Sequence, residues 1–134
     1  VSGLALGCDA SAHRGCMDAD GGTIAIVATG LNLVHPRENI PLQEEILRKG
    51  GLILSEQPLG VKANPTRLVS RNRLQAALSE EVIVAECPKH SGTMHTVRFA
   101  QKYGKKVKAA RLPYDKEENS GNKYIIDTGI GEGI

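Results

Sequence analysis

Aromatic residues are scarce in this chain of 134 residues, which has no Trp, one Phe and three Tyr. A protein that grips single-stranded nucleic acid mainly by stacking bases needs several aromatic rings. The composition therefore argues against an interface built on base stacking. The net charge is only +2, which is too small for a surface that is basic throughout, so any anion site must be local.

Long apolar runs are also missing, and no segment approaches the roughly 20 apolar residues of a membrane span or resembles a secretion signal. The three cysteines, at positions 8, 16 and 87, are an odd number without the spacing of a disulfide framework. We therefore expect a protein of the reducing cytoplasm with no membrane partner. The chain lacks an initiator Met and begins inside an apolar segment, from which we expect an N-terminal part to be missing.

Short apolar runs alternate with helical patterns along a chain that has the length of one domain. The apolar runs predict buried strands at 23–29, 52–56, 82–86 and 106–110, with residues 1–6 as the remains of an earlier strand. The helical patterns fall at about 9–18, 39–49, 66–79, 93–103 and 121–128. This alternation predicts a single three-layer α/β domain over 1–134, in which helices flank a mostly parallel sheet.

Ligands of such sheets bind at the carboxyl ends of the strands, and the first loop there is rich in glycine. Gly3 and Gly7 flank the end of the first strand, and either Asp9 or Ser11 can cap the helix that follows. Glycine lets a ligand approach the backbone closely, but the spacing matches neither a dinucleotide fingerprint nor a P-loop. A ligand loop and a plain tight turn both remain open.

Cys8, His13 and Cys16 lie within one predicted helix and raise the question of a metal site. Successive helical residues are rotated by about 100°, so these three side chains point in different directions, and no fourth ligand is evident. We expect buried thiols and a histidine on the helix surface, with neither a metal nor a cofactor.

A second loop, at Ser91, Gly92 and Thr93, lies between a predicted strand and the helix over 93–103. Hydroxyl and N–H donors at a helix start suit a phosphate group. Simple capping of the helix by Ser91 or Thr93 explains the same residues equally well.

Arginines crowd the start of the helix predicted after residue 65. Arg67 and Arg71 share a helix face with Leu74 and Leu78, which we expect in the core. Positive charge near a helix N-terminus is unfavourable by about 0.3–1 kcal/mol per residue. An anionic ligand would turn this cost into attraction, whereas pairing with carboxylates at strand ends, Glu56 or Glu86, is the alternative.

Four blocks of the chain, taken in order, resemble the DNA-processing protein A family, also called DprA or Smf. They cover residues 1–15, 21–31, 54–86 and 91–129. The resemblance is carried by VSGLALGCDASAHRG at the start, RNR at 71–73 and SGT at 91–93. The fold that this resemblance implies is an extended Rossmann-like domain.

The resemblance also implies a non-catalytic protein of DNA uptake and natural transformation that binds single-stranded DNA and loads the recombinase RecA during homologous recombination, as a homodimer. It places a site for DNA phosphates on these residues: Ser2, Gly3, Gly7, Lys62, Arg67, Arg71, Asn72, Arg73, Ser91, Gly92 and Thr93. Leu68 and Val69 stand where the family usually has Phe-Pro, which removes one expected base-stacking contact.

Two other functions fit the same fold. Phosphoribohydrolases that activate cytokinins carry a P-G-G-x-G-T-x-x-E block with a catalytic glutamate, whereas this chain has KHSGTMHTVR at 89–98, without a carboxylate. A sensor that binds a nucleotide would use the same pocket for a small ligand, and Leu68 in place of an aromatic residue favours it.

Overall fold

A computed structural model describes all residues from Val1 to Ile134. The chain forms two compact units, residues 1–71 and 72–134, each of which is described by itself. Both units have α/β architecture with parallel strands flanked by helices, as the alternation of patterns predicts. That the two units together make a single domain stays a prediction.

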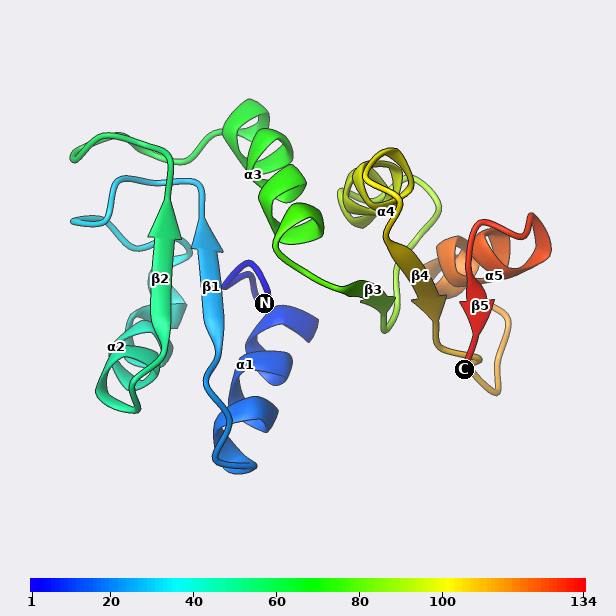
Figure 1. Cartoon of the computed structure of the whole chain (residues 1–134), viewed down its shortest axis with the longest axis horizontal. Coiled ribbons are helices and arrows are strands. Elements are labelled where there is room, and N and C mark those ends of the chain that lie inside the picture. Colours follow the sequence, from blue (N-terminus) through cyan, green and yellow to red (C-terminus); the bar gives the residue numbers. More distant parts are fainter. The chain divides into compact units, whose positions relative to one another are not determined.

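The first unit contains a parallel pair of strands, β1 (Ile24–Val27) and β2 (Leu52–Ser55), with Ile24 opposite Leu52. Figure 1 shows the two strands as adjacent arrows that point in the same direction. Two helices, α1 (Cys8–Asp18) and α2 (Ile40–Arg48), precede β1 and β2 respectively. A short 3₁₀ turn, Arg37–Asn39, leads into α2.

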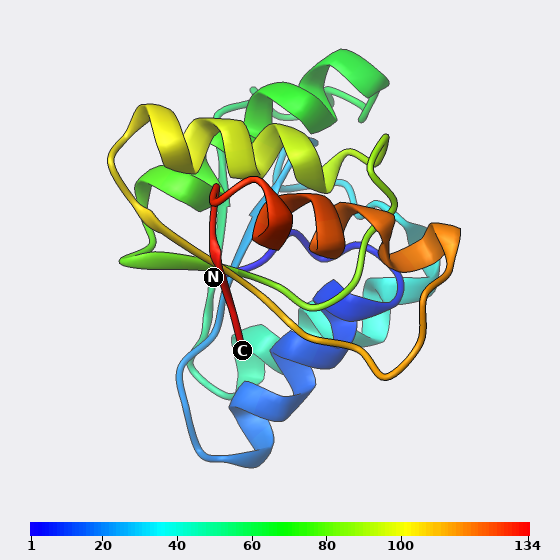
Figure 2. The ribbon, with the colours of Figure 1, turned by 90° about the vertical axis from the view of Figure 1, so that its right-hand side faces the viewer.

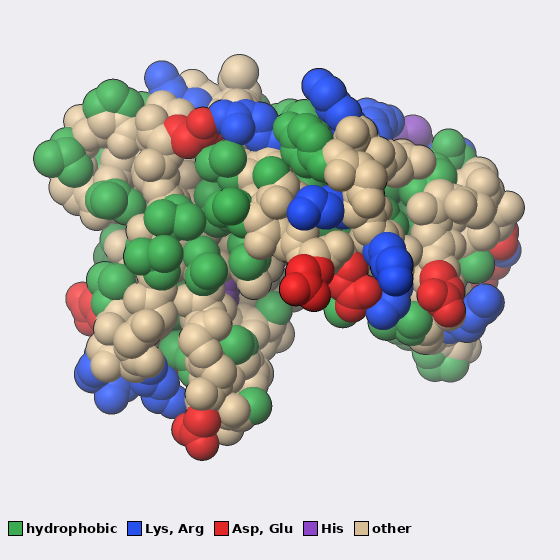
Figure 3. Space-filling view, in the orientation of Figure 1, with side chains coloured by type: hydrophobic (Ala, Val, Ile, Leu, Met, Phe, Trp, Pro, Cys, Tyr) green, Lys and Arg blue, Asp and Glu red, His purple; other side chains and the backbone are tan.

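The core of the first unit lies between these helices and one face of the strands. Met17 and Ile46 from the helices meet Ala25, Val27 and Ile53 from the strands. Because side chains alternate along a strand, Leu52 and Leu54 point to the opposite face. Hydrophobic side chains gather over β1 and β2 on the face shown in Figure 3.

The second unit holds three parallel strands in sequential order: β3 (Glu81–Val84), β4 (Lys106–Ala109) and β5 (Glu132–Gly133). Two helices connect them, α4 (Thr93–Lys102) and α5 (Ser120–Asp127), and a 3₁₀ turn at Glu117–Asn119 precedes α5. Both crossovers move along the sheet in the same direction, so right-handed connections put both helices on one face. Figure 2 shows α4 and α5 on the same side of β4 and β5.

The core of the second unit is formed where these helices cover the strands. Val97 and Ile125 from the helices pack with Val84 and Val107 from the strands. Helix α3 (Pro65–Ala77) spans the boundary, so its first half belongs to the first unit and its second half to the second.

The predicted helices and the four complete strands are confirmed to within a few residues. Two expectations are wrong, and one short strand was not predicted. Residues 1–6 contribute only a single bridge, between Ser2 and Ala25, instead of a strand. The two-residue strand β5 has no counterpart in the sequence reading, because two residues carry no periodicity. Leu78 lies just past α3 and is 54% exposed, so it is no core residue. No helix has the length and apolar character needed to cross a membrane.

Candidate functional site

The glycine loop of the first unit lies along the edge of β1. The Ser2 amide donates to the Ile24 carbonyl at 3.0 Å, and the Ile26 amide donates to the Ser2 carbonyl at 2.9 Å. Beyond Ser2 the backbone turns sharply, with a φ of +61° at Leu4 and +80° at Gly7. Leu4 is completely buried in the core, so a non-glycine residue is held in a conformation that L-residues rarely adopt.

Asp9 bonds to this loop and does not cap its own helix. One carboxylate oxygen accepts from the Ser2 hydroxyl at 2.6 Å. The other accepts from the amides of Gly3 and Ala5, each at 3.1 Å. The residue at the N-cap of α1 is Gly7, and no side chain caps the helix. The expectation that Asp9 or Ser11 caps it is therefore wrong, because the loop amides compete successfully for the carboxylate.

His13 is fully buried, and its ring joins the same loop to Thr23, the residue before β1. The Leu4 amide donates to Nε2 at 3.3 Å, so the proton of a neutral ring lies on Nδ1, which is 2.7 Å from the Thr23 hydroxyl. Burial lowers the pKa of His13 from its ordinary value of 6.5, against the smaller opposing charge of Asp9. The expected histidine on the helix surface is thus wrong, and of the two expected buried thiols Cys8 is exposed and Cys16 only partly buried. No group of three or more His, Cys, Asp or Glu residues is arranged to hold a metal ion.

Arg71, on the first half of α3, is buried and bonds to backbone carbonyls. Its Nη1 donates to the Gly3 carbonyl at 2.8 Å and to the Ile26 carbonyl. Burial lowers the pKa of the guanidinium from its ordinary value of 12.5, and the charge of Asp9 opposes this shift. A buried cation needs such compensation, and here carbonyl dipoles and a nearby carboxylate supply it.

Asn39 completes the support of the loop by donating to the Leu4 carbonyl at 2.8 Å. The amides of Gly3, Leu4 and Ala5 and the carbonyls of Gly3 and Leu4 are therefore all bonded to side chains. In contrast, the amides from Leu6 to Ala10 have no acceptor within the chain. The free donors of the loop thus lie at the start of α1.

Two cationic residues of the predicted site meet before the first turn of α3. The Arg67 guanidinium donates to the Lys62 carbonyl at 3.1 Å, and the Arg67 amide donates to the Asn64 side chain at 2.8 Å. Lys62 is exposed and Arg67 is half-buried. Arginine–carboxylate pairing is the alternative to an anion site. The Arg67 side chain donates to a backbone oxygen, and Glu86 accepts from the Tyr114 hydroxyl at 2.7 Å.

In the second unit, Asn72 links α3 to the second predicted loop. Its side-chain amide donates to the Gly92 carbonyl at 3.2 Å. The Ser91 hydroxyl accepts from the Thr93 amide at 3.1 Å, which closes a tight turn ahead of α4. Gly92 is the N-cap residue and no side chain caps α4, so the expected capping by Ser91 or Thr93 is wrong. Arg73, next to Asn72, is half-buried.

The structure therefore brings the predicted residues together in two sets. In the first unit, Arg71 bonds to Gly3 in the glycine loop, which also contains Ser2, and Gly7 is the N-cap of α1. Lys62 and Arg67 meet each other before α3, and neither they nor Arg73 are shown in contact with that loop. Asn72, Ser91, Gly92 and Thr93 form the second set. Sequence reasoning missed the roles of Asp9, His13 and Asn39 in holding the loop. A signal existed, because Asp9 and His13 are four residues apart and so share one face of α1.

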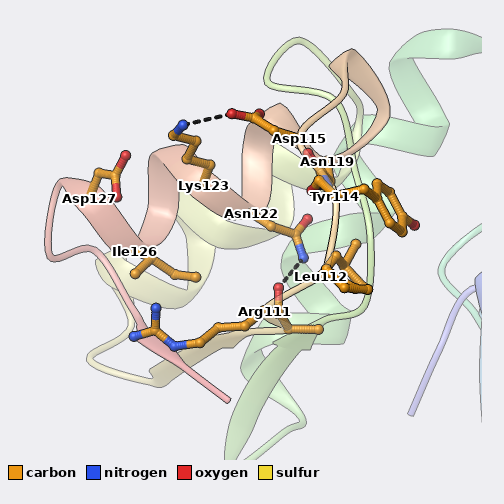
Figure 4. A pocket seen from close by; sticks show the side chains of 11 residues that line it. Arg111, Leu112, Tyr114, Asp115, Asn119, Asn122, Lys123, Ile126 and Asp127 are labelled. Atoms are coloured by element: carbon orange, nitrogen blue, oxygen red, sulfur yellow. Dashed lines mark hydrogen bonds and ion pairs between the residues drawn. The ribbon is translucent and has the colours of Figure 1, made fainter.

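A pocket of about 410 Å³ in the second unit involves none of the predicted residues. It lies between the loop after β4 and α5, as Figure 4 shows. Asn122 at its floor is saturated, since it donates to three backbone carbonyls and accepts from the Cys87 amide. Lys123 and Asp115 on its wall pair with each other at 2.9 Å. Asn122 therefore holds the fold together at this pocket, and Lys123 and Asp115 form an exposed ion pair on its rim.

Comparison with known proteins gives one consistent family. The family model of the DNA recombination-mediator protein A matches residues 1–132. Protein Smf of Synechocystis sp. is 41% identical over 129 residues, which are 96% of this chain and 32% of that protein. The chain thus spans about a third of the length of this curated relative.

Two solved structures have the same fold. The X-ray structure of DNA processing protein A from Streptococcus pneumoniae has a TM-score of 0.91 at 33% identity, over 99% of this chain and 46% of that one. DNA processing protein A from Helicobacter pylori, whose structure concerns its single-stranded DNA binding mode, has a TM-score of 0.88 at 33% identity, over 99% and 59%.

Proposed function

The chain belongs to the DNA recombination-mediator protein A family, and from this membership we propose that it binds single-stranded DNA through the phosphates. The observation that carries the proposal is the bond from Arg71 to Gly3. It joins the arginine-rich start of α3 to the glycine loop within one unit, so the cations and the loop act on the same ligand. A relative of the same fold is described with a single-stranded DNA binding mode.

The proposed contacts of the first unit are electrostatic. Lys62 and Arg67 supply an exposed and a half-buried cation, and the free amides at the start of α1 supply donors for an anion. Ser2, Gly3 and Gly7 shape the loop that presents those amides, and the charge of Arg71 adds to the local potential. No Phe, Tyr or Trp occurs before Phe99, so this unit has no ring on which a base could stack.

The proposed contacts of the second unit are the turn of Ser91, Gly92 and Thr93 together with Arg73. Asn72 holds this turn through the Gly92 carbonyl, so its own amide group positions the loop. The amides at the start of α4 carry partial positive charge, which favours a phosphate. Each unit would thus bind a phosphate group of its own.

The role that we propose is binding without catalysis, in DNA processing and recombination. The proposal also includes the loading of a RecA-type recombinase and the formation of a homodimer. Both are functions of whole proteins, and this chain spans only about a third of its relative's length. We expect the protein to accelerate filament formation by a RecA-type recombinase on single-stranded DNA. Sedimentation measurements that find only a monomer would remove the homodimer from the proposal.

The decisive test is a salt titration of binding to a fluorescent oligothymidine, followed by anisotropy. For the parent, the logarithm of the association constant falls steeply with the logarithm of salt concentration, because phosphate contacts release counterions. Arg67→Ala and Lys62→Ala each reduce the slope by about 1 and weaken binding to all base compositions alike.

Arg48→Ala is the matched control, since it removes an equal charge from the exposed end of α2. It leaves the slope unchanged. A parent protein that is stabilised by mononucleotides but not by oligonucleotides would show that the site is a nucleotide sensor. Release of a base from a nucleoside monophosphate would show an enzyme instead.

A further inference from the structure

Asp9 presents a contradiction in an anion site. Its carboxylate lies against Ser2 and Gly3, beside the loop that is proposed to meet phosphate groups. A negative charge at this place repels a phosphate, so on charge alone Asp9 weakens the binding of DNA. Its three hydrogen bonds to the loop indicate a different contribution.

The bonds of Asp9 determine which backbone amides are free. The carboxylate occupies the amides of Gly3 and Ala5. His13 occupies the amide of Leu4 between them. With these three amides taken, the next free donors in the chain are those from Leu6 onward. The carboxylate therefore selects the start of α1 as the donor surface of the loop.

Asp9 also sets the course of the loop between the edge of β1 and α1. Leu4 is inserted into the core at a φ of +61°, and the residues on both sides of it are tied to the same carboxylate. An oxygen displaced by one methylene group cannot meet both amides and the Ser2 hydroxyl at once. The geometry of the carboxylate, rather than its charge, is what the loop requires.

We infer that Asp9 is a positioning residue of the proposed DNA site: it holds residues 3–5 so that the amides of Gly7 and Cys8 face the phosphate. This inference rests on the proposed function. It assigns a favourable effect on DNA binding to the length and hydrogen bonds of the Asp9 side chain, and none to its charge.

Two variants separate geometry from charge. Asp9→Asn removes the charge but keeps an oxygen for the amides of Gly3 and Ala5 and an NH₂ group for the Ser2 hydroxyl oxygen. Asp9→Glu keeps the charge but moves the oxygens by one methylene group. Asp18→Asn, at the exposed far end of α1, is the matched control for loss of one negative charge.

Oligothymidine binding is measured for all variants at several salt concentrations. We expect Asp9→Asn to bind as tightly as the parent or more tightly, and Asp9→Glu to bind roughly tenfold more weakly, the equivalent of one misplaced hydrogen-bond network. Asp18→Asn binds like the parent. Unchanged affinity in Asp9→Glu, or a loss in Asp9→Asn equal to that in Asp9→Glu, overturns the inference.

A second measurement on the parent protein does not depend on the folding of any variant. In a ¹⁵N NMR titration with oligothymidine, the amide signals of Gly7 and Cys8 shift, whereas those of Gly3 and Ala5 stay in place and are protected from hydrogen exchange. Shifts confined to Gly3 and Ala5 would show that these amides bind the phosphate, and the inference would be wrong. If the parent binds no oligonucleotide, the proposed function fails, while the protection of Gly3 and Ala5 still reports on the bonds to Asp9.

Discussion

The Arg71 guanidinium donates to the Gly3 carbonyl at 2.8 Å, although 68 residues separate the two in the sequence. The next residue, Asn72, does the same in the second unit, where it donates to the Gly92 carbonyl at 3.2 Å. Two consecutive residues of α3 thus each hold a loop that sequence analysis had assigned to ligand binding. Arg71 and Asn72 therefore hold the two loops of the proposed site, so the charge of Arg71 is only part of its proposed role.

Replacement of Arg71 should cost much more stability than replacement of Arg67. Arg71→Ala leaves the buried carbonyls of Gly3 and Ile26 without this donor, so we expect the free energy of unfolding to fall by about 2–4 kcal/mol. Arg67→Ala, at a half-buried position with one carbonyl contact, should cost about 1 kcal/mol or less. Urea denaturation followed by circular dichroism measures both, and equal losses would show that the Arg71 bonds contribute nothing special.

The stability of the first unit should decrease in mild acid because of His13. Burial lowers the pKa of this ring in the folded state, while the unfolded state keeps a value near 6.5. The unfolded chain therefore binds more protons below pH 6.5, and the free energy of unfolding falls as the pH is lowered further, by up to about 1.4 kcal/mol per pH unit. Protonation also removes the acceptor of the Leu4 amide.

His13→Gln tests this assignment, because glutamine can accept a hydrogen bond but does not titrate. We expect the variant to be less stable than the parent at pH 7.5 but to depend less on pH between 7.5 and 5.5. His35→Gln, at an exposed position, should keep the pH dependence of the parent. A parent and a His13→Gln variant with the same pH dependence would assign the titration to another group.

The architecture could be predicted from the sequence because its signals are local. The strands β1 and β2 are short apolar runs, and the helices have a 3.6-residue period. Both patterns can be recognised without knowing which elements they pack against. The roles of Arg71 and His13 could not be predicted in this way. In the sequence Arg71 looks like an exposed cation, and only the fold brings the carbonyls of Gly3 and Ile26 to it. In the same way His13 looks like a surface residue, and only the fold brings the Leu4 amide to its ring.

The capping predictions failed for a related reason. Asp9 and Ser91 each lie near the start of a helix. The Asp9 carboxylate instead accepts from amides of the preceding loop, and the Ser91 hydroxyl accepts from the amide of Thr93, two residues further on, in a turn rather than from the N-cap position. In a cap and in a loop the side-chain oxygen accepts from a backbone amide, so the sequence alone does not tell the two apart, and the backbone conformation determines which amide is within reach. A polar residue at a helix start can therefore be picked out from sequence more readily than its hydrogen-bond partner.

Asn122 should be the most sensitive polar residue of the second unit. It is buried, donates to the carbonyls of Val84, Ala85 and Ala110, and accepts from the Cys87 amide at 2.9 Å. Asn122→Ala removes all of these bonds at once, and we expect the free energy of unfolding to fall by about 3 kcal/mol or more. Asn119→Ala, whose side chain bonds only within the loop before α5, should cost less. Thermal denaturation compares the two variants, and a larger loss of stability in Asn119→Ala would contradict the central role of the Asn122 hydrogen bonds.

Two glycines inside helices should respond to alanine with opposite signs. Alanine is favoured over glycine in a helix by about 0.5–1 kcal/mol, because glycine loses more backbone entropy on folding. At Gly15 in α1 a new Cβ would meet nothing within 4 Å, so Gly15→Ala should stabilise the protein by about that amount.

At Gly121 in α5 a new Cβ would lie 2.6 Å from the Cys87 sulfur and 2.7 Å from the Cys87 carbonyl oxygen. The Cys87 carbonyl oxygen cannot move aside without breaking the hydrogen bond that it accepts from the Gly121 amide at 2.9 Å. Gly121→Ala should therefore destabilise the protein by about 1–3 kcal/mol. Denaturation of both variants under one set of conditions decides the matter, and a stabilising Gly121→Ala would mean that α5 can shift away from the loop at Cys87.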